Sequence, residues 1–319
     1  MPLIVPDKLP AAGTLKEENI FTMARARASK QNIRPLKIVI VNLMPTKIAT
    51  ETQLARVLAN SPLQVEMTLV KMDSHESKNI SQEHMEVFYK TVEEIKEEYF
   101  DGMILTGAPV EQMPFENVDY WKELCELLEF AKTHVYSNMF ICWGAQAALY
   151  YYYGIQKRIL DSKVFGVFEH RVIRPHNPLV RGFDELFFAP HSRHTEIRRE
   201  DIENCKSLRI LADSSEVGPH IVSTENGRQI FVLGHQEYDK ATLAHEYFRD
   251  VNKGLDIDVP ANYFRNDDPE EEILFRWRSH ANLLFSNWLN YYVYQAVPYD
   301  LNDLREGKED AWREIIVEE

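Results

Sequence analysis

One cysteine stands at the junction between a strand-like run and a helix-like run. The chain is apolar up to Cys142, a glycine follows at Gly144, and residues 145–153 are rich in alanine and aromatic residues. A strand-turn-helix elbow of this kind presents a nucleophile at a helix N-terminus, where the aligned peptide dipoles favour a thiolate and free N–H groups can bind an oxyanion. The pattern therefore predicts a cysteine nucleophile. The alternative is a buried structural cysteine, which is the commoner role of a free cysteine.

A second pattern, His-Gln-Glu, follows another apolar run. His235 and Glu237 come directly after the segment IFVLG. A histidine at a strand end can reach a site at the carboxyl edge of a parallel sheet, and a carboxylate partner fixes its tautomer and raises its basicity. The spacing indicates a general base with a supporting acid. The alternative is a surface histidine beside a surface glutamate, because His-x-Glu often arises by chance.

Three further patterns are weaker. His191 and His194 have a His-x-x-His spacing, but no third nearby ligand supports zinc, so we expect no metal and a polar loop lining a cleft. The turn at Thr106-Gly107 ends a strand-like run and could supply N–H groups to an oxyanion, or it could simply end the strand. The glycines form neither G-x-G-x-x-G nor a P-loop, which disfavours dinucleotide and Walker-type phosphate sites.

The elements that must position these residues alternate between strand and helix. The expected strands are 37–43, 65–72, 102–110 and 135–142, and the expected helices are 46–58, 80–98, 121–133 and 143–153. Such an alternation predicts an α/β fold with a mainly parallel sheet and helices on both faces. The later expected elements are strands at 185–190 and 208–214, a hairpin at 220–235 with Asn226-Gly227 at its turn, and helices at 239–254 and 280–295.

The chain of 319 residues divides, on composition, into three parts. Residues 1–35 are proline-rich and predict an extended arm with one short helix at 17–30. Residues 36–298 predict a single α/β domain, and residues 299–319 predict an acidic C-terminal tail.

Charge and hydropathy exclude several classes of partner. The formal net charge is −14, whereas nucleic acid and anionic membranes attract positively charged surfaces. The first residues lack the pattern of a secretory signal, and the longest apolar stretch, 140–153, is too short to span a bilayer. Cys125, Cys142 and Cys205 form neither a disulfide framework nor a zinc spacing. We therefore expect a cytoplasmic protein that binds neither nucleic acid nor membrane.

Long segments across the chain share their pattern with one known family. They are KIVIVNLMPTK (37–47), DGMILTGAPVE (101–111), ICWGAQAALYYYYG (141–154), VFGVFEHRV (164–172), ELFFAPHSRHTE (185–196), FVLGHQEY (231–238) and RWRSHANLLFSNWLNYYVYQ (276–295). With them the chain resembles the homoserine O-acyltransferases of methionine biosynthesis, also called homoserine O-succinyltransferases. The resemblance covers residues 1–298 and leaves out the acidic tail.

The resemblance implies the fold of class I glutamine amidotransferase domains, a flavodoxin-like α/β structure. It implies that Cys142 is the nucleophile, His235 the general base and Glu237 its supporting acid. Glutaminases of this fold carry Gly two residues before the nucleophile and usually Pro between His and Glu. This chain has Phe140 and Gln236 there, which favours the acyltransferase branch.

The resemblance also implies the substrates. Substrate-binding positions of the family correspond to Lys163, Ser192 and Arg249. The position that separates acetyl from succinyl transfer corresponds to Glu111: Gly there accompanies succinyl-CoA and Glu accompanies acetyl-CoA. A glutamate repels the free carboxylate of a succinyl group and takes up its space, so we expect acetyl-CoA.

The implied reaction is homoserine O-acetyl transfer through an acyl-enzyme on Cys142. Its substrates are L-homoserine and acetyl-CoA, and the oxyanion lies at the backbone N–H of Trp143 and the loop around Gly107. Family members are typically homodimers without metal or cofactor. The alternatives are succinyl transfer by the same residues, a glutaminase or small hydrolase on the same elbow, and a binding protein that kept the fold.

Overall fold

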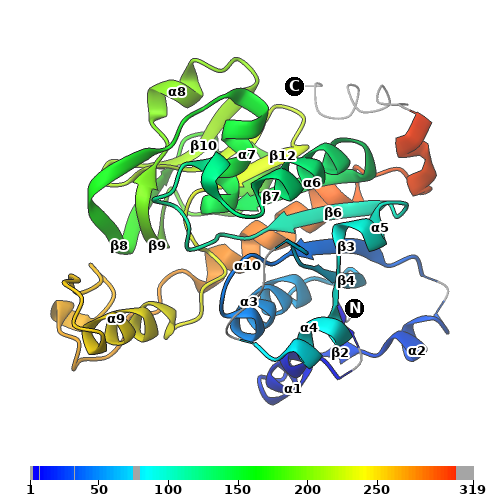
Figure 1. Ribbon diagram of the computed structural model, residues 1–319, viewed down its shortest axis with the longest axis horizontal. Helices are drawn as coiled ribbons and strands as arrows, with labels where there is room; N and C mark the ends of the chain where they lie inside the picture. The colour runs from blue at the N-terminus through cyan, green and yellow to red at the C-terminus, as the bar shows by residue number, and fades with distance from the viewer. Residues whose placement is uncertain (1–2, 7, 32, 75–79, 307–319) are drawn as a thin grey trace. The chain divides into compact units, whose positions relative to one another are not determined.

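The computed structural model describes residues 3–6, 8–31, 33–74 and 80–306 (Figure 1). The chain divides into two compact units. The first unit comprises 1–105, 116–139 and 286–319, and the second comprises 106–115 and 140–285. Within the described part of the chain, no helix is both long enough and apolar enough to cross a membrane. Residues 307–319 of the expected acidic tail lie outside the described residues, and the expected division into arm, domain and tail stays a prediction.

The first unit is built on parallel strands. They are β1 (Leu3–Ile4), β2 (Thr22–Met23), β3 (Leu36–Val41), β4 (Val65–Val70), β5 (Tyr89–Lys90) and β6 (Phe100–Leu105), and β7 (Val135–Ile141) begins in this unit. The order is β2-β1-β4-β3-β6, neighbouring strands in it run parallel, and β5 pairs with β4. The central strands β3 and β6 are almost wholly buried, as expected for a parallel sheet covered on both faces.

Helices connect these strands (Figure 1). They are α1 (Pro10–Glu17), α2 (Arg25–Ala28), α3 (Lys47–Ala59), α4 (Gln82–Phe88), α5 (Val92–Ile95) and α6 (Trp121–His134). The structure confirms the helices expected at 46–58 and 121–133. The single helix expected at 80–98 is wrong, because β5 interrupts it and Thr91 starts a new helix with a capping box to Glu94. The helix expected at 17–30 is also wrong, because β2 separates α1 from α2.

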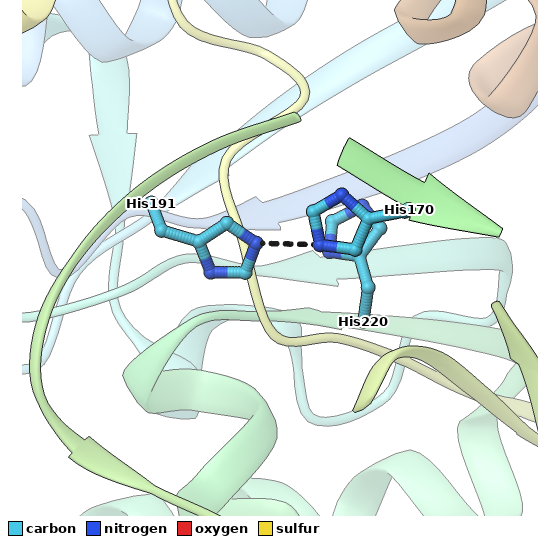
Figure 2. Close-up of side chains that lie close together, drawn as sticks. All are labelled: His170, His191 and His220. Atoms are coloured by element: carbon cyan, nitrogen blue, oxygen red, sulfur yellow. Dashed lines mark hydrogen bonds between the residues drawn. The ribbon is translucent and has the colours of Figure 1, made fainter. Parts of the chain in front are cut away.

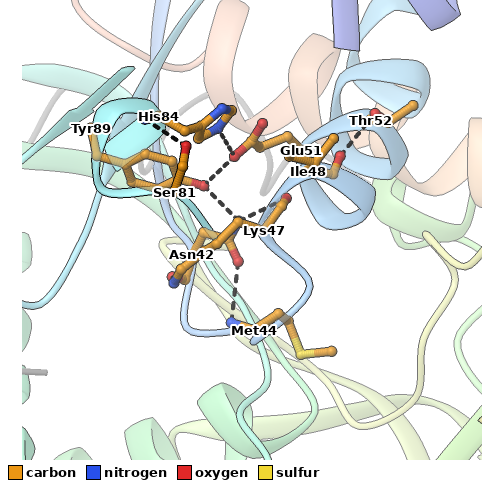
Figure 3. Close-up of polar contacts among 9 residues, drawn as sticks. All are labelled: Asn42, Met44, Lys47, Ile48, Glu51, Thr52, Ser81, His84 and Tyr89. Atoms are coloured by element: carbon orange, nitrogen blue, oxygen red, sulfur yellow. Dashed lines mark hydrogen bonds and ion pairs between the residues drawn. The ribbon is translucent and has the colours of Figure 1, made fainter. Parts of the chain in front are cut away.

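A buried polar cluster ties α3, α4 and β5 to the end of β3 (Figure 3). The Glu51 carboxylate accepts a hydrogen bond from the Tyr89 hydroxyl at 2.6 Å and lies 3.0 Å from Nε2 of His84. Asn42 donates to the same hydroxyl at 2.9 Å, and the Lys47 ammonium donates to the Asn42 carbonyl. Burial lowers the pKa of Lys47 to about 8, against the nearby Glu51 charge that raises it. The hydrogen bonds of the cluster hold the start of α3 against the end of β3.

The C-terminal helix expected at 280–295 is present but changes type. It runs as α10 (Arg278–Asn287) and continues as a π-helical segment, Trp288–Tyr294. The indole of Trp288 covers Gly102 of β6, where a Cβ atom would lie 2.8 Å from the ring, and its N–H donates to the Ser137 hydroxyl at 3.0 Å. The absence of a side chain at Gly102 therefore leaves room for the Trp288 ring to pack on the sheet.

The second unit is built on antiparallel strands. They are β8 (Arg158–Val172), β9 (Leu186–Glu196), β10 (Leu208–Ser214), β11 (Gly218–Thr224) and β12 (Gln229–Val232), in the order β12-β11-β10-β8-β9. The unit also carries α7 (Trp143–Tyr153), α8 (Arg199–Glu203) and α9 (Thr242–Asn252). The expected hairpin is confirmed as β11 and β12. Together the two units confirm an α/β fold whose sheet is mixed, with its parallel strands in the first unit.

Two expectations fail in this unit. The sequence analysis did not predict β8, because its residues do not alternate in hydropathy. Both ends of the strand are exposed or half-buried, and its pairing with β9 stabilises it. The strand expected at 185–190 continues as β9 through His191 and His194, so the expected polar loop there is wrong. Positions three apart on a strand point to opposite faces, and His191 is accordingly buried while His194 is half-buried.

The close approach of β8 to Ala261 requires a glycine at position 166. Gly166 has φ +148°, and a Cβ atom there would lie 2.4 Å from the Ala261 carbonyl oxygen. We predict that Gly166→Ala lowers the free energy of unfolding by about 1–3 kcal/mol, measured by urea denaturation. The control is Gly13→Ala on the exposed face of α1, where a Cβ atom meets nothing within 4 Å. This change should raise stability by about 0.5–1 kcal/mol. Equal effects of the two changes would contradict the packing described.

Candidate active site

Cys142 occupies a sharp turn between β7 and α7. Its backbone has φ +50° and ψ −115°, a conformation that is strained for any residue other than glycine. Two hydrogen bonds hold the turn: the Cys142 N–H donates to the Val232 carbonyl at 2.8 Å, and the Cys142 carbonyl accepts from the Gln146 N–H at 3.1 Å. The sulfur thus sits at the N-terminus of an 11-residue helix, in the geometry of a nucleophile elbow.

His235 and Glu237 lie on the loop that follows β12, and both are buried. His235 Nδ1 is 2.7 Å from Glu237 Oε1, and the same ring hydrogen-bonds the Cys142 side chain. Because Nδ1 is engaged by the carboxylate, the ring faces the sulfur through Nε2. The loop is fixed from its backbone as well, since the His235 N–H donates to the Pro190 carbonyl of β9 at 2.8 Å. The structure therefore brings Cys142, His235 and Glu237 into one chain of hydrogen bonds.

The electrostatics of this hydrogen-bonded triad favour a charged imidazole on His235. Burial alone would lower the pKa of His235, but the Cys142 and Glu237 charges and their hydrogen bonds outweigh it and raise the pKa well above its usual value. With this raised pKa the ring is an imidazolium at neutral pH, between the Glu237 carboxylate and the Cys142 sulfur. This is the charge distribution that activates a cysteine nucleophile.

Tyr238 backs the His235 ring, and no sequence pattern singled it out. The two rings stack with centroids 4.0 Å apart, and the Tyr238 carbonyl accepts a hydrogen bond from the Trp277 indole at 2.8 Å. Burial, followed by the charges of Glu246, Glu237, Cys142 and Glu111, raises the pKa of Tyr238 well above its usual value. The phenol therefore stays neutral and packs against the histidine.

Three buried histidines form a layer next to Gly234, the residue before His235, and Figure 2 shows how their rings lie together. Ring nitrogens of His170, His191 and His220 all lie within 4.8 Å of one another. A Cβ atom at Gly234 would lie 2.8 Å from His191 and from His220, so only glycine lets the loop rest on these rings. Nε2 of Gln236 lies 3.3 Å from Nε2 of His220 and joins the loop to the layer a second time.

The hydrogen bonds of His170 and His191 are those of neutral imidazole rings. His170 Nδ1 donates to the Phe168 carbonyl at 3.0 Å, so its Nε2 accepts from His191 Nε2 at 3.1 Å, and Arg193 Nε donates to His191 Nδ1 at 3.4 Å. Burial lowers the pKa of His170 to about 3 and lowers the pKa of His191 and His220 as well. Three histidines could bind a metal ion, but the positive charge of the adjacent Arg193 guanidinium disfavours a metal cation there. The expectation of no metal stays a prediction.

The three expected substrate-binding residues converge on a carboxylate that sequence reasoning missed. Glu246 of α9 lies 2.6 Å from the Lys163 ammonium of β8 and 2.8 Å from the Ser192 hydroxyl of β9. Arg249, one turn further along α9, lies 3.9 Å from Glu246 and makes a two-pronged ion pair with Asp250 at 2.7 and 2.8 Å. No local pattern marks Glu246, because its partners come from two distant strands.

Glu111 connects to the elbow through two other side chains. The Thr195 hydroxyl of β9 lies 3.3 Å from Oε2 of Glu111 and 2.8 Å from the Gln146 amide oxygen, and Gln146 belongs to the first turn of α7. Of the expected oxyanion groups, Trp143 is the first residue of α7 and Gly107 lies just beyond the end of β6. Their roles, like those of the other expected site residues, stay predictions.

Known proteins resemble this chain over most of its length. The model of the family described as homoserine O-succinyltransferase matches residues 2–299. The homoserine O-acetyltransferase of Petrotoga mobilis is 57% identical over 95% of this chain and 98% of its own. The enzyme of the same name from Brevibacillus brevis is 59% identical over 95% of this chain and 99% of its own. A glutamine amidotransferase structure from Thermotoga maritima aligns with a TM-score of 0.52 at 12% identity, covering 81% of this chain and 98% of that one.

The fold is therefore that of the class I glutamine amidotransferase-like α/β proteins, and the site is a cysteine elbow facing a histidine. Within that class, the chain belongs to the homoserine O-succinyltransferase family, a family of acyltransferases.

The protonation of His235 can be measured directly. We predict that ring nitrogen chemical shifts in the wild-type protein report an imidazolium at neutral pH, which loses its proton only as the pH rises through the raised pKa. Cys142→Ser and Glu237→Gln each remove a charge that raises this pKa, so both should shift the titration to lower pH. His245, on the surface-facing side of α9 and outside this chain of bonds, serves as the internal control. A neutral His235 ring at neutral pH in the wild type would contradict the ion pair.

Proposed function

We propose that this acyltransferase moves an acetyl group from acetyl-CoA to the γ-hydroxyl of L-homoserine, through an acyl-enzyme on Cys142. The observation that carries the proposal is the chain of hydrogen bonds from the Cys142 side chain through His235 to Glu237, in a family that transfers acyl groups to homoserine. The relatives named homoserine O-acetyltransferase support the choice of acetyl.

In the first half-reaction the Cys142 thiolate attacks the thioester carbonyl of acetyl-CoA. The new carbon–sulfur bond forms as the bond to CoA breaks, and the His235 imidazolium gives its Nε2 proton to the departing CoA sulfur. One thioester replaces another, so the exchange is nearly balanced in energy. Glu237 keeps the ring oriented as its charge changes.

In the second half-reaction the now neutral His235 takes the proton of the homoserine γ-hydroxyl as that oxygen attacks the acetyl carbonyl. The Cys142 sulfur leaves as a thiolate, and the imidazolium–thiolate pair is restored. In the acyl-enzyme the Cys142 charge is gone, but the Glu237 charge and hydrogen bond still raise the pKa of His235, which helps the ring to accept a proton from a hydroxyl that is a poor acid. Two separate half-reactions predict ping-pong kinetics.

Backbone N–H groups at Trp143, with help from the loop around Gly107, stabilise the tetrahedral oxyanion of each step. The helix N-terminus places the Trp143 N–H next to the reacting sulfur. Loss of one such donor costs about 10²- to 10³-fold in rate in other enzymes.

Lys163, Ser192 and Arg249 bind the amino-acid part of homoserine. Arg249 uses Nε and one terminal nitrogen for Asp250, which leaves its other terminal nitrogen for the substrate carboxylate. Its side chain is 52% exposed, whereas that of Lys163 is only 14% exposed. Lys163 is therefore the better desolvated of the two cations.

Glu111 selects the acyl group. Its Oε2 is held by the Thr195 hydroxyl beside the first turn of the elbow helix, so a free carboxylate on the acyl chain would meet a fixed negative charge. The competing candidate is succinyl transfer, which the description of the matching family names. We further propose that the protein works in the cytoplasm as a homodimer, without metal or cofactor; these properties rest on the family resemblance.

Steady-state assays with homoserine test the function and the acyl preference together. We predict that the product is O-acetylhomoserine and that acetyl-CoA gives the higher kcat/KM. Glu111→Gly should shift the succinyl-CoA to acetyl-CoA ratio of kcat/KM by about 10- to 100-fold towards succinyl, because a nearby like charge is lost.

The matched control is Glu225→Gly at the tip of the β11–β12 hairpin, where the side chain is 80% exposed. This change should leave the ratio as it is. Glutamine hydrolysis without homoserine acylation would overturn the proposed function. An unchanged ratio in Glu111→Gly would overturn only the role of Glu111.

A further inference from the structure

Glu246 is the carboxylate on which the substrate-binding residues meet. A single oxygen, Oε1, lies 2.6 Å from the Lys163 ammonium, 2.8 Å from the Ser192 hydroxyl and 3.9 Å from the Arg249 guanidinium. Its side chain is 17% exposed, so it is partly desolvated yet reachable. A charge in this setting interacts more strongly with a ligand than a charge on the open surface does.

The second oxygen of Glu246 is available to a ligand. The contacts with Lys163, Ser192 and Arg249 all use Oε1, and within the described part of the chain none of these three partners uses Oε2. The other acid of the region, Asp250, is committed to the two-pronged pair with Arg249. A ligand that brings its own positive charge therefore finds one carboxylate with unused acceptor capacity.

We propose that Glu246 accepts the α-ammonium group of the amino-acid substrate, and that this contact makes the enzyme select α-amino acids over simple hydroxy acids. The proposal rests on the proposed function and deepens it. Glu246 is a specificity-determining residue here, distinct from the groups that make and break bonds at Cys142.

The charges of a zwitterion match this arrangement. The substrate carboxylate meets the Lys163 and Arg249 cations, and the substrate ammonium meets Glu246, so that each charge has an opposite partner. When Lys163 turns part of its contact from Glu246 to the substrate carboxylate, its ammonium keeps a second partner, because it lies 4.0 Å from the Phe165 ring centroid in a cation–π contact. The substrate thus takes the place of an internal ion pair.

The helix that carries Glu246 is held firmly enough to set this geometry. The start of α9 packs into a core with β8 that includes Leu243, Ala244 and Trp277. The Tyr263 hydroxyl accepts from the Ala244 N–H at 3.2 Å and donates to the Lys240 carbonyl, which fixes the first turn of the helix. Glu246 comes two residues after Ala244, so its position relative to β8 and β9 is set by the fold.

Three acceptors separate the role of Glu246 from the role of the cations. They are L-homoserine, 4-hydroxybutyrate, which lacks the amino group, and 3-aminopropan-1-ol, which lacks the carboxylate. For each, kcat/KM is measured with acetyl-CoA in the wild type, in Glu246→Gln and in Glu246→Asp. The rate of acetyl-enzyme formation from acetyl-CoA alone is measured beside them. The control variant is Glu185→Gln, whose side chain is 93% exposed.

In Glu246→Gln we expect kcat/KM for homoserine to fall by about 10- to 100-fold, mainly through KM, because a hydrogen bond between charged groups is lost. The value for 4-hydroxybutyrate should change little, so the preference for homoserine over 4-hydroxybutyrate should fall by the same factor. The preference over 3-aminopropan-1-ol should be kept. Glu246→Asp should restore part of the loss, and Glu185→Gln should match the wild type.

Retention of the wild-type preference for homoserine over 4-hydroxybutyrate in Glu246→Gln would overturn the proposal. Slowed acetyl-enzyme formation in a folded Glu246 variant would also overturn it, because acetyl-CoA carries no ammonium to this carboxylate. If Glu246→Gln fails to fold, Glu246→Asp, whose carboxylate is one methylene shorter, should still show a reduced preference for homoserine over 4-hydroxybutyrate, and an unchanged preference would overturn the proposal. Failure of the proposed function looks different: the wild type itself would then acetylate none of the three acceptors.

Discussion

The contact between the Cys142 sulfur and the His235 ring is the interaction on which the rest of the site depends. It requires a cysteine at positive φ, which is a strained conformation, and a buried imidazole that stays charged. Neither is stable alone. The strain is held by the hydrogen bond from Cys142 to Val232 of β12, and the imidazolium is stabilised by Glu237. The second unit supplies all of these partners, so the site and the antiparallel strands form one structure.

Packing behind His235 explains why the contact stays aligned. The neutral histidine layer, with Gly234 resting on it, supports the loop from one side, and the Tyr238 ring stacks on the imidazole. Neutral rings suit this place, because additional positive charge would compete with the imidazolium. The buried guanidinium of Arg193 is an exception, because it adds a positive charge here. Burial lowers its pKa, while the charges of Cys142 and of nearby acids partly offset that decrease. Among the described residues, the buried positive charges of the site are therefore limited to the His235 imidazolium and the Arg193 guanidinium, each next to acidic groups.

The sequence predicted the parts of this structure that depend on local signals. The elbow at Cys142 and the strand-end position of His235 are local, because each is a short apolar run followed by a turn. The parts it missed depend on tertiary partners. β8 has no clear hydropathy pattern and is held by pairing with β9, and the interruption of the helix expected at 80–98 comes from pairing of β5 with β4. From the sequence alone, Glu246 looks like an ordinary acidic residue on a helix surface. Its role becomes visible only in the fold, where β8 and β9 place Lys163 and Ser192 next to it.

The mass of the intact protein after mixing with acetyl-CoA, in the absence of homoserine, tests the central claim most directly. If the sulfur of Cys142 takes the acyl group, the wild-type protein gains the mass of one acetyl group, peptide mapping places it on Cys142, and adding homoserine removes it. Cys142→Ala, which keeps His235 and Glu237, should gain nothing. A Cys142→Ala protein that still acetylates homoserine at near wild-type rate, or a wild-type adduct located on another residue, would contradict the account.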